Sequence, residues 1–328
     1  MKRLGYWIAG TLATLGAAGA VLAQRGATEA PADGTGAETV VPARGGNSFG
    51  GFGGGTLRVT NASGEREEWG VDGKMHTVPL RSPEPHNPGA PEFHVDSHFK
   101  SDTFRFVRIE YNSWQFSDAW LTGSPYSDYN FAYRLQQLTS IKVDKDPLWI
   151  KLTDPRLFDY PLIYMLEVRT LVFTDDEAKA LRKYLLNGGF LLVEDFWSDD
   201  RRPDPNHISA WGSFHEQMKR VFPDKEPVEL DISHPIFHSV FDLKSIPQEP
   251  GLDWAMEHPE STSEHEVGPA HYKAYFDDKG RMVAICCQNT ALGDGWDWEG
   301  YGSWYFEKYS QKVGYPMGVN IVFYAMTH

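Results

Sequence analysis

Hydrophobic residues in the second half of the chain form short runs and stripes that predict alternating strands and helices. Residues 104–111 alternate apolar and polar side chains, as a half-buried strand does. The short continuous apolar run at 160–166 is typical of a buried parallel strand, and residues 190–195 are expected to be a second buried strand. Between them, Thr174 and Glu177 have the spacing of a helix capping box. This strand–helix–strand unit predicts a parallel sheet with helices on both faces.

Further elements extend the same pattern toward the carboxyl terminus. The stretch 293–309 is rich in glycine and aromatic residues and is expected to be a loop. We therefore expect one α/β domain with a mostly parallel sheet over residues 103–328. The remaining expected elements are helices over 129–138 and 213–221, strands over 272–276 and 281–287, and a last apolar segment over 318–326.

The amino-terminal part of the chain lacks this pattern. Lys2 and Arg3 precede a weakly interrupted apolar run, which is typical of a cleavable signal peptide over residues 1–23. The run is rich in glycine, alanine and threonine and shorter than the roughly 20 strongly apolar residues of a membrane span, so cleavage is preferred to anchoring. Residues 24–56 have the composition of a disordered linker, and residues 57–102 are expected to be an irregular leader. The protein is therefore expected to be exported, to the periplasm or the extracellular space.

Composition and charge exclude two classes of protein. The 328 residues include 45 acidic and 31 basic side chains, a formal net charge of −14. Loss of Lys2 and Arg3 with the signal peptide would make the charge −16. Such a charge repels phosphate backbones, so nucleic-acid binding is not expected. A disulfide scaffold is not expected either, because the two cysteines, Cys286 and Cys287, are adjacent.

Six motifs in the expected domain resemble those of a known bacterial family. They occupy residues 104–109, 128–134, 152–157, 188–197, 234–238 and 318–328. Together they resemble the bacterial domain-of-unknown-function family numbered 4159, over essentially the whole of the expected domain. This resemblance implies family membership and brings no established activity.

A more distant resemblance concerns the order of the elements. An apolar strand, a helix, Gly188-Gly189, a second apolar strand and the His-Pro-Ile turn at 234–236 are similar to the class I glutamine-amidotransferase-like superfamily, in particular its trehalose-utilisation-like members. This implies a doubly wound, flavodoxin-like sheet. It also implies a cysteine nucleophile on a sharp elbow after the strand at 190–193, where this chain has Glu194 and Asp195. Because that cysteine is absent, amide transfer is not expected.

Glu194 and Asp195 are the first candidates for a site, since ligands of open α/β sheets bind beyond the carboxyl ends of the strands. Adjacent strand residues point to opposite faces, so at most one of the two faces a ligand. Together with His215, His234 or His238 they could hold a divalent metal or perform acid–base catalysis. The preferred interpretation is structural, with Asp195 capping the following loop and the histidines hydrogen-bonded within the fold. No cofactor is therefore assigned, and a divalent metal stays open.

The aromatic and acidic residues of 293–305 admit two interpretations. Exposed, they could stack on sugar rings and accept hydrogen bonds from hydroxyl groups; buried, they would form a lid over one end of the sheet, and the lid is preferred. Candidate ligand-binding residues are Asp195, Trp197, Asp294, Trp296, Asp297, Trp298 and Trp304.

Cys286 and Cys287 end an apolar run and point to opposite faces of the expected strand. Burial of both as small hydrophobic residues is preferred. A thiol nucleophile or a strained disulfide between neighbours is the alternative, and a nucleophile would need an adjacent base that the sequence does not display.

The preferred function is a non-catalytic binding or accessory domain, with carbohydrate as candidate ligand by analogy of fold. One alternative is a carboxylate- or metal-dependent hydrolase or isomerase that acts on a sugar-like substrate. Another is a cell-envelope assembly component whose aromatic loop docks a protein. The expected partners are thus a small molecule or an envelope protein, with no nucleic acid and no membrane anchor after cleavage.

Overall fold

The computed structural model describes residues 65–69, 75–79, 103–114, 119–144, 146–197, 209–264, 268–299 and 303–328. The expected signal peptide and linker, residues 1–56, lie outside the described residues, as does most of the expected leader. Within that leader, β1 (Glu65–Trp69) and β2 (Met75–Pro79) pair in an antiparallel arrangement. In the part of the chain that the structure describes, no helix is long and apolar enough to cross a membrane.

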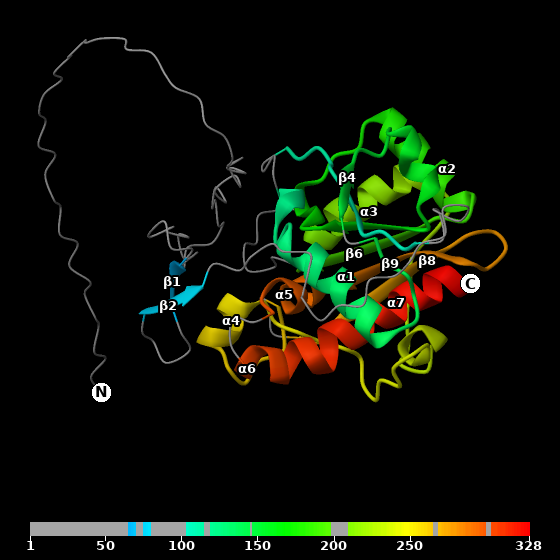
Figure 1. Ribbon diagram of the computed structural model, residues 1–328. Coiled ribbons are helices and arrows are strands. Elements are labelled where there is room, and N and C mark those ends of the chain that lie inside the picture. Colours follow the sequence, from blue (N-terminus) through cyan, green and yellow to red (C-terminus); the bar gives the residue numbers. More distant parts are fainter. Residues whose placement is uncertain are drawn as a thin grey trace, which may run out of the picture. The chain divides into compact units, whose positions relative to one another are not determined.

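Residues beyond 102 that the structure describes build a seven-stranded sheet with helices on both faces, which confirms the expected α/β class (Figure 1). The strand order is β4-β3-β5-β6-β9-β8-β7, in which β8 runs antiparallel to both of its neighbours, β9 and β7, and all other neighbouring strands pair in parallel. Taken in chain order, the parallel strands follow the flavodoxin-like order 2-1-3-4-5. The strands are β3 (Val107–Ile109), β4 (Leu148–Ile150), β5 (Leu162–Leu166), β6 (Phe190–Phe196), β7 (Val228–Glu229), β8 (His271–Phe276) and β9 (Met282–Gln288).

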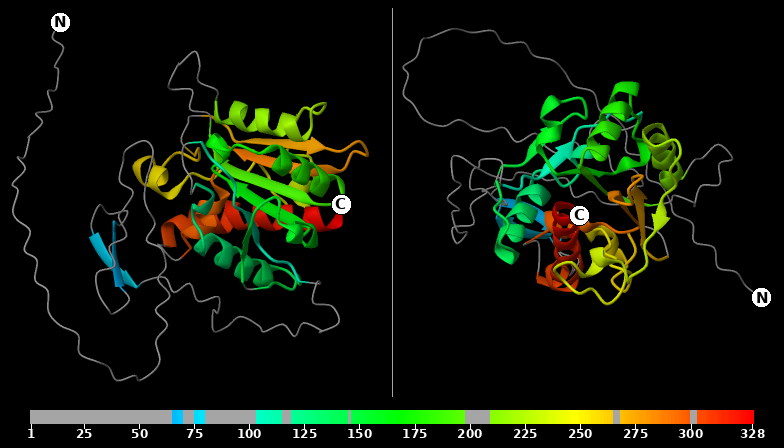
Figure 2. Two further views of the ribbon diagram at one scale, coloured as in Figure 1. Left: turned by 90° about the horizontal axis from the view of Figure 1, so that it is seen from above. Right: turned by 90° about the vertical axis from the view of Figure 1, so that its right-hand side faces the viewer.

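Two layers of helices cover the sheet (Figure 2). α2 (Asp175–Leu186) and α3 (Ala210–Val221) pack on one face, and α1 (Tyr126–Leu138) and α7 (Tyr315–Thr327) pack on the other. Alternate residues of β6 serve the two cores: Leu191 and Val193 contact the α2–α3 side, and Leu192 contacts the α1–α7 side. Strands buried on both faces explain why the sequence shows continuous apolar runs.

The capping box expected before α2 is present. The Thr174 hydroxyl accepts a hydrogen bond from the Glu177 amide at 3.2 Å, and the Glu177 carboxylate accepts one from the Thr174 amide at 2.7 Å. The two bonds satisfy amide groups that have no partner within the helix. The helix therefore begins where the sequence predicts.

The described residues of the stretch 293–309 are mostly helical, so the expectation of a loop is wrong for them. α5 (Leu292–Asp297) and α6 (Ser303–Tyr305) are followed by a π-helical segment (Phe306–Gly314) that continues into α7. Glycine content suggested a loop, yet two of these glycines, Gly293 and Gly295, are needed for close packing inside α5. Other short elements are α4 (Leu252–Glu257), η1 (Ala119–Leu121), η2 (Pro155–Asp159), η3 (Val168–Thr170) and η4 (Pro235–His238).

The first strand is also shorter than the alternation predicts. Only Val107–Ile109 pair as a strand, whereas Phe104 makes a single bridge to Val143. The alternating burial of residues 104–107 comes from packing of Phe104 and Phe106 in the α1–α7 core. The hydrophobic alternation thus predicted the position of the first strand correctly but overestimated the number of residues that pair in it.

Candidate functional site

The carboxyl ends of β3, β5, β6 and β9 lie at one edge of the sheet, because these neighbouring strands are parallel. β4 lies on one side of β3 and β5 on the other, so the strand order reverses between β3 and β5. Ligands of open α/β sheets bind beyond the carboxyl ends at such a reversal. Glu167 directly follows β5, and Glu194 and Asp195 lie near the end of β6. The fold therefore places these three acids where it predicts a site.

Asp195 has a backbone conformation that is rare outside glycine. Its φ is 58°, and the pairing of β6 with β9 shifts register between Val193 and Phe196. Such an irregularity re-aims a side chain and costs about 1–3 kcal/mol. It falls where the amidotransferase-like resemblance implies an elbow, but the residue is an aspartate. Asp195 is 5% exposed, and no hydrogen bond reaches its carboxyl group from the described residues.

Asp195 belongs to a set of converging acids, here called the acid cluster. Burial raises the pKa of Asp195 well above its ordinary value, and repulsion from four other carboxylates raises it further. A group in this position holds its proton more tightly than an exposed aspartate does. The acid cluster consists of Glu167, Glu194, Asp195, Glu249, Glu264 and Asp294.

Glu194 is fully buried and hydrogen-bonded on both oxygens. The Tyr164 hydroxyl donates to Oε1, and the Gly293 amide, in the first turn of α5, donates to Oε2 at 3.1 Å. Burial nevertheless raises the pKa of Glu194 to about 7, against the lowering effect of these donors and of Arg108. Glu194 therefore joins β6 to α5 and can change charge near neutral pH.

Glu249 is fully buried between α5 and the π-helical segment. A Cβ atom on Gly295 would lie 2.3 Å from its Oε1, and one on Gly314 would lie 2.6 Å from its Oε2. Neither oxygen accepts a hydrogen bond of normal geometry from the described residues. Burial, followed by repulsion from Asp294 and Glu194, raises the pKa of Glu249 well above its ordinary value, although Tyr305 and Gly314 counteract this.

Glu264 and Asp294 meet at the start of α4. The Leu252 amide donates to Asp294 Oδ2 at 2.9 Å, and the Gly251 backbone stabilises the Glu264 carboxylate. Both carboxylates lie against Gly251, where a Cβ atom would be 3.0 Å from Glu264 and 3.1 Å from Asp294. They supply the amino-terminal cap that α4 lacks in its own sequence, since its N-cap residue is a glycine.

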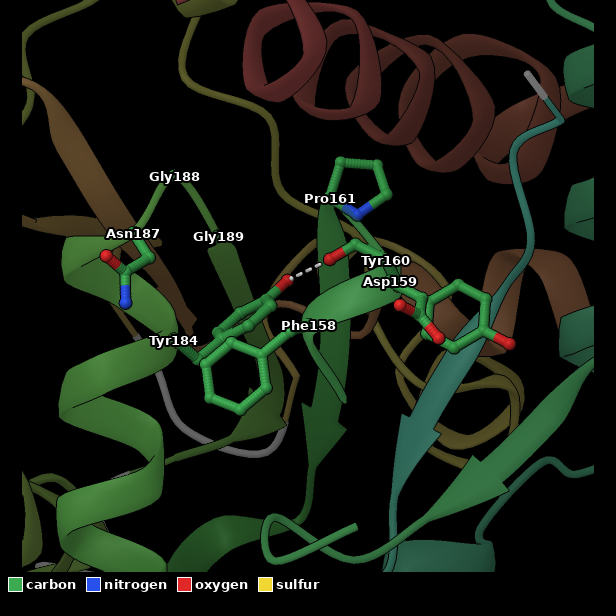
Figure 3. Close-up of a pocket in the computed structure, with 8 residues that line it drawn as sticks. All are labelled: Phe158, Asp159, Tyr160, Pro161, Tyr184, Asn187, Gly188 and Gly189. Atoms are coloured by element: carbon green, nitrogen blue, oxygen red, sulfur yellow. Dashed lines mark hydrogen bonds between the residues drawn. The ribbon is translucent and has the colours of Figure 1, made fainter. Parts of the chain in front are cut away.

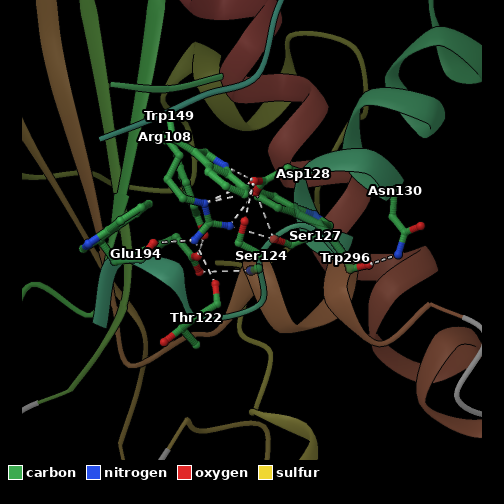
Figure 4. Close-up of polar contacts among 12 residues, drawn as sticks. Arg108, Thr122, Ser124, Ser127, Asp128, Asn130, Trp149, Glu194 and Trp296 are labelled. Atoms are coloured by element: carbon green, nitrogen blue, oxygen red, sulfur yellow. Dashed lines mark hydrogen bonds and ion pairs between the residues drawn. The ribbon is translucent and has the colours of Figure 1, made fainter. Parts of the chain in front are cut away.

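The arginines near the acid cluster already have partners. Arg169 pairs with Glu167 at 2.6 Å, and its guanidinium carbon lies 4.0 Å from the centre of the Trp197 ring. Arg108 is fully buried and paired with Asp128, and it also donates to the backbone oxygens of Trp120 and Thr122 at 2.8 Å (Figure 4). The acid cluster is thus only partly balanced by positive charge.

The histidines proposed as partners of Asp195 make other contacts. His234 packs on Tyr324 with ring centres 5.6 Å apart, and His238 hydrogen-bonds to Asp242 and to the Ile232 carbonyl, both at 2.7 Å. His215 contacts the Tyr275 hydroxyl at 2.8 Å and Glu226 at 3.2 Å. Among the described residues, no three acid, imidazole or thiol groups have the spacing of a metal site.

The aromatic candidates within residues 293–305 are mainly packed against neighbouring elements. Trp296 is fully buried among Phe106, Phe131 and Tyr164, and Asp297 is 4% exposed. Trp298 and Trp304 are partly buried against the core that Leu252, Ala255, Tyr305 and Tyr309 form. The described aromatic residues of this segment are thus mainly packed within the domain, and Asp294 is the residue that the segment contributes to the acid cluster.

Both cysteines are free thiols with no exposed surface. Cys286 packs in the α2–α3 core and Cys287 in the α1–α7 core, as residues on opposite faces of β9 must. Burial raises the pKa of both thiols. The expectation that they are buried as small hydrophobic residues is confirmed.

A surface hollow lies at the opposite edge of the sheet, where β5 and β6 begin (Figure 3). Its volume is about 280 Å³, and its lining includes the Phe158 and Tyr184 rings, Asp159 and Asn187. The Tyr184 hydroxyl donates to the Tyr160 carbonyl at 2.9 Å and is thereby committed to the fold. The hollow is separate from the acid cluster and contains no partner for Asp195.

Sequence reasoning identified Glu194, Asp195 and Asp294 but missed Glu167, Glu249 and Glu264. The missed acids stand outside any recognisable motif, in connecting segments whose course the sequence does not reveal.

Comparison with known proteins gives one family. The family model described as Domain of unknown function (DUF4159) matches residues 105–326, more than half of the chain. No curated protein matches the sequence.

Proposed function

Because the chain belongs to the family of domains of unknown function DUF4159, we propose its function from geometry: it binds a small hydroxylated ligand of the carbohydrate class at the acid cluster. The observation that carries this proposal is Asp195. Its carboxyl group is nearly buried, lacks a hydrogen-bond partner in the described part of the chain, and is held in left-handed backbone at the carboxyl end of a central strand.

A nearly buried carboxyl group that receives no hydrogen bond from the described residues is costly for a fold that gains nothing from it. Leaving a polar group without a partner costs about 1–3 kcal/mol, and the backbone conformation adds a similar amount. A ligand with hydroxyl groups would offset this cost by donating hydrogen bonds to Asp195 and to the partly exposed Glu167 and Asp294. Trp197, partly buried beside Arg169, offers an aromatic edge to such a ligand.

The proposed function is non-catalytic as far as thiol chemistry is concerned. Neither cysteine is accessible, and the position of the implied nucleophile holds Asp195. We also propose that binding takes place after export, which rests on the signal-like sequence of residues 1–23.

The test is binding of five probes, glucose, glucosamine, N-acetylglucosamine, glucuronate and trehalose, measured by ligand-observed NMR with the wild type and the Asp195→Asn variant. We expect at least one probe to bind, and its affinity to fall about tenfold in Asp195→Asn, the loss of one charge-assisted hydrogen bond. The control is the Asp159→Asn variant, which changes an exposed acid of the hollow. This variant should bind the probe with the same affinity as the wild type. Absence of binding, or equal affinity in the two variants, contradicts the proposal.

A second candidate function is a carboxylate-dependent hydrolase or isomerase acting on a sugar-like substrate. The raised pKa of Glu194, to about 7, together with that of Asp195, favours it, because a general acid must hold a proton near neutral pH. Turnover of 4-nitrophenyl glycosides that disappears in Asp195→Asn while binding persists would establish catalysis. If the wild type does not turn over these glycosides, the hydrolase function is rejected and only the binding function remains.

A further inference from the structure

We propose that the surface hollow at the amino ends of β5 and β6 binds the guanidinium group of an arginine side chain that a partner protein presents. Its lining residues come from two places: the end of η2 with the two residues that follow it, and the carboxyl-terminal turn of α2 with the two glycines after it. The hollow is separate from the acid cluster, so this inference does not depend on the proposed sugar binding.

The size of the hollow suits one side chain. Its volume of about 280 Å³ is just below the range of roughly 300–1,000 Å³ that pockets for whole small-molecule ligands have. Phe158 is 44% exposed, and Asp159 and Asn187 are exposed as well, so the hollow opens to solvent. A long side chain can therefore enter it while the backbone that carries this side chain stays at the surface.

Two aromatic rings form the apolar part of the hollow. The rings of Phe158 and Tyr184 meet edge to face, with centres 6.4 Å apart (Figure 3). Tyr184 is buried, whereas Phe158 is exposed and has the Lys183 Nζ atom 5.0 Å from its ring centre. The fold itself thus places a cation on this ring. A guanidinium group is flatter and more weakly hydrated than an ammonium group, so it suits the same ring better.

Two polar side chains of the hollow are available to a ligand. None of the hydrogen bonds and ion pairs among the described residues involves the Asp159 carboxylate or the side-chain amide of Asn187. The charge of Asp159 acts on Arg156, but the guanidinium group of Arg156 is paired with Asp154 at 2.7 Å. A carboxylate accepts two N–H groups of a guanidinium group at once, and an amide oxygen accepts another.

The carboxyl-terminal end of α2 adds further acceptors. Carbonyl groups in the last turn of a helix have no partner within it, and the helix dipole gives them a partial negative charge. Arg281 donates to two such carbonyl oxygens, those of Leu185 and Gly189, the latter at 3.2 Å. Nothing lies within 4 Å of a Cβ atom on Gly188, so the backbone between these residues is open to a ligand. The same end of α2 therefore disfavours an anion and favours a second guanidinium group.

The experiment is a titration of the full chain with capped tripeptides, followed by heteronuclear NMR of the backbone amides. The probes are N-acetyl-glycyl-X-glycinamide with arginine, citrulline or lysine as X. Citrulline keeps the planar N–H groups of arginine without its charge. We expect the arginine peptide to shift the amide signals of Asn187, Gly188 and Gly189. It should bind about threefold more tightly than the citrulline peptide, the effect of one exposed ion pair or cation–π contact, and more tightly than the lysine peptide.

Substitutions in the hollow should change the affinity for the arginine peptide in both directions. Asp159→Asn and Phe158→Leu should each lower it about threefold, and both alter exposed side chains, so the fold is preserved. Lys183→Gln should raise it, because the Phe158 ring then loses its own cation. Asp176→Asn is the matched control and should leave the affinity unchanged. It removes an exposed acid at the other end of α2, roughly 16 Å away along the helix.

Four outcomes would overturn the inference: equal affinity for the arginine and citrulline peptides, tighter binding of the lysine peptide, an unchanged affinity in Asp159→Asn, or an equal loss in Asp176→Asn. Methylguanidinium alone should bind more weakly than the arginine peptide, and equal affinity would assign the hollow to a free guanidinium compound instead of a protein. If no peptide binds, the inference fails while the sugar-binding proposal stands, because none of these probes is a sugar.

Discussion

At the scale of single residues, two of the buried acids lie directly against glycines of neighbouring helical segments. Glu194 accepts the Gly293 amide, and Glu249 lies against Gly295 and Gly314. Each glycine leaves space that a carboxylate fills, since a Cβ atom on Gly293 would lie 2.6 Å from Glu194 Oε1. Glycine is thus required at these helical positions by close approach of a side chain, in spite of its poor helix propensity.

The Gly295→Ala substitution should therefore destabilise the protein. The added methyl group would lie 2.3 Å from Glu249 Oε1 and 2.8 Å from its Cδ, and Gly314 blocks retreat on the other side. We expect a loss of about 1–3 kcal/mol in the free energy of unfolding, the usual cost of overpacking, measured by urea denaturation. Glu249→Ala in the same chain should restore most of it, and a double variant whose losses simply add would refute the explanation.

At the scale of elements, the buried pair of Arg108 and Asp128 fixes α1 to the sheet. Arg108 comes from β3 and Asp128 from the first turn of α1, and both side chains are fully buried. Arg108 also donates hydrogen bonds to the Trp120 and Thr122 carbonyl oxygens. One guanidinium group thus binds residues that precede α1 in the chain as well as Asp128 within it. Trp149 of β4 donates to Asp128 at 3.2 Å and extends the same contact to the edge strand.

Asp128→Ala should accordingly be among the most destabilising substitutions of this region. It leaves the Arg108 charge buried without its counter-ion, which costs about 3–5 kcal/mol. The free energy of unfolding, measured with guanidinium chloride, should recover in part when Arg108→Met is added, because the unpaired charge is then gone. A double variant less stable than Asp128→Ala would contradict this account.

At the scale of the whole molecule, buried and exposed acids respond to pH in opposite directions. The four acids Glu194, Asp195, Glu249 and Glu264 have raised pKa values because they are buried. Exposed acids paired with donors or cations have lowered pKa values and stabilise the fold only above their range of titration: Asp154, Glu226, Asp231, Asp242 and Asp278. The protein should therefore be most stable in mild acid rather than at neutral pH.

Glu194 allows a test of the direction in which the stability of the protein changes with pH. Its pKa is about 7 in the folded state and 4.5 for the ordinary group, so between these values the folded chain binds a proton that the unfolded chain has lost. The contribution of Glu194 to the free energy of unfolding should fall as pH rises from about 4.5 to about 7, by about 1.4 kcal/mol per pH unit for its one proton, and should fall no further above that pH. Urea denaturation of Glu194→Gln should show a shallower fall, and slopes equal to those of the wild type would contradict the assignment.

The amino-acid sequence by itself determined the local elements and the class of fold. Apolar runs defined β5 and β6, the Thr174–Glu177 spacing defined the start of α2, and the strand–helix–strand order required a parallel sheet. The same logic placed Glu194 and Asp195 at the carboxyl edge. These features depend on residues within one or two turns of each other, where side-chain periodicity and hydrogen-bond spacing act directly.

Only the tertiary structure decided which groups meet. Glu167 and Glu264 act on Asp195 from separate connecting segments, and Glu249 is influenced by Glu194 and Asp294. His234 and His238 instead pack around η4 and α7. The left-handed turn at Asp195 coincides with the shifted pairing of β6 with β9. Glu194 and Glu249, which are distant in sequence, fill the space beside the glycines of α5. Convergence of distant residues depends on crossovers and packing that sum over the whole chain, and no local pattern contains them.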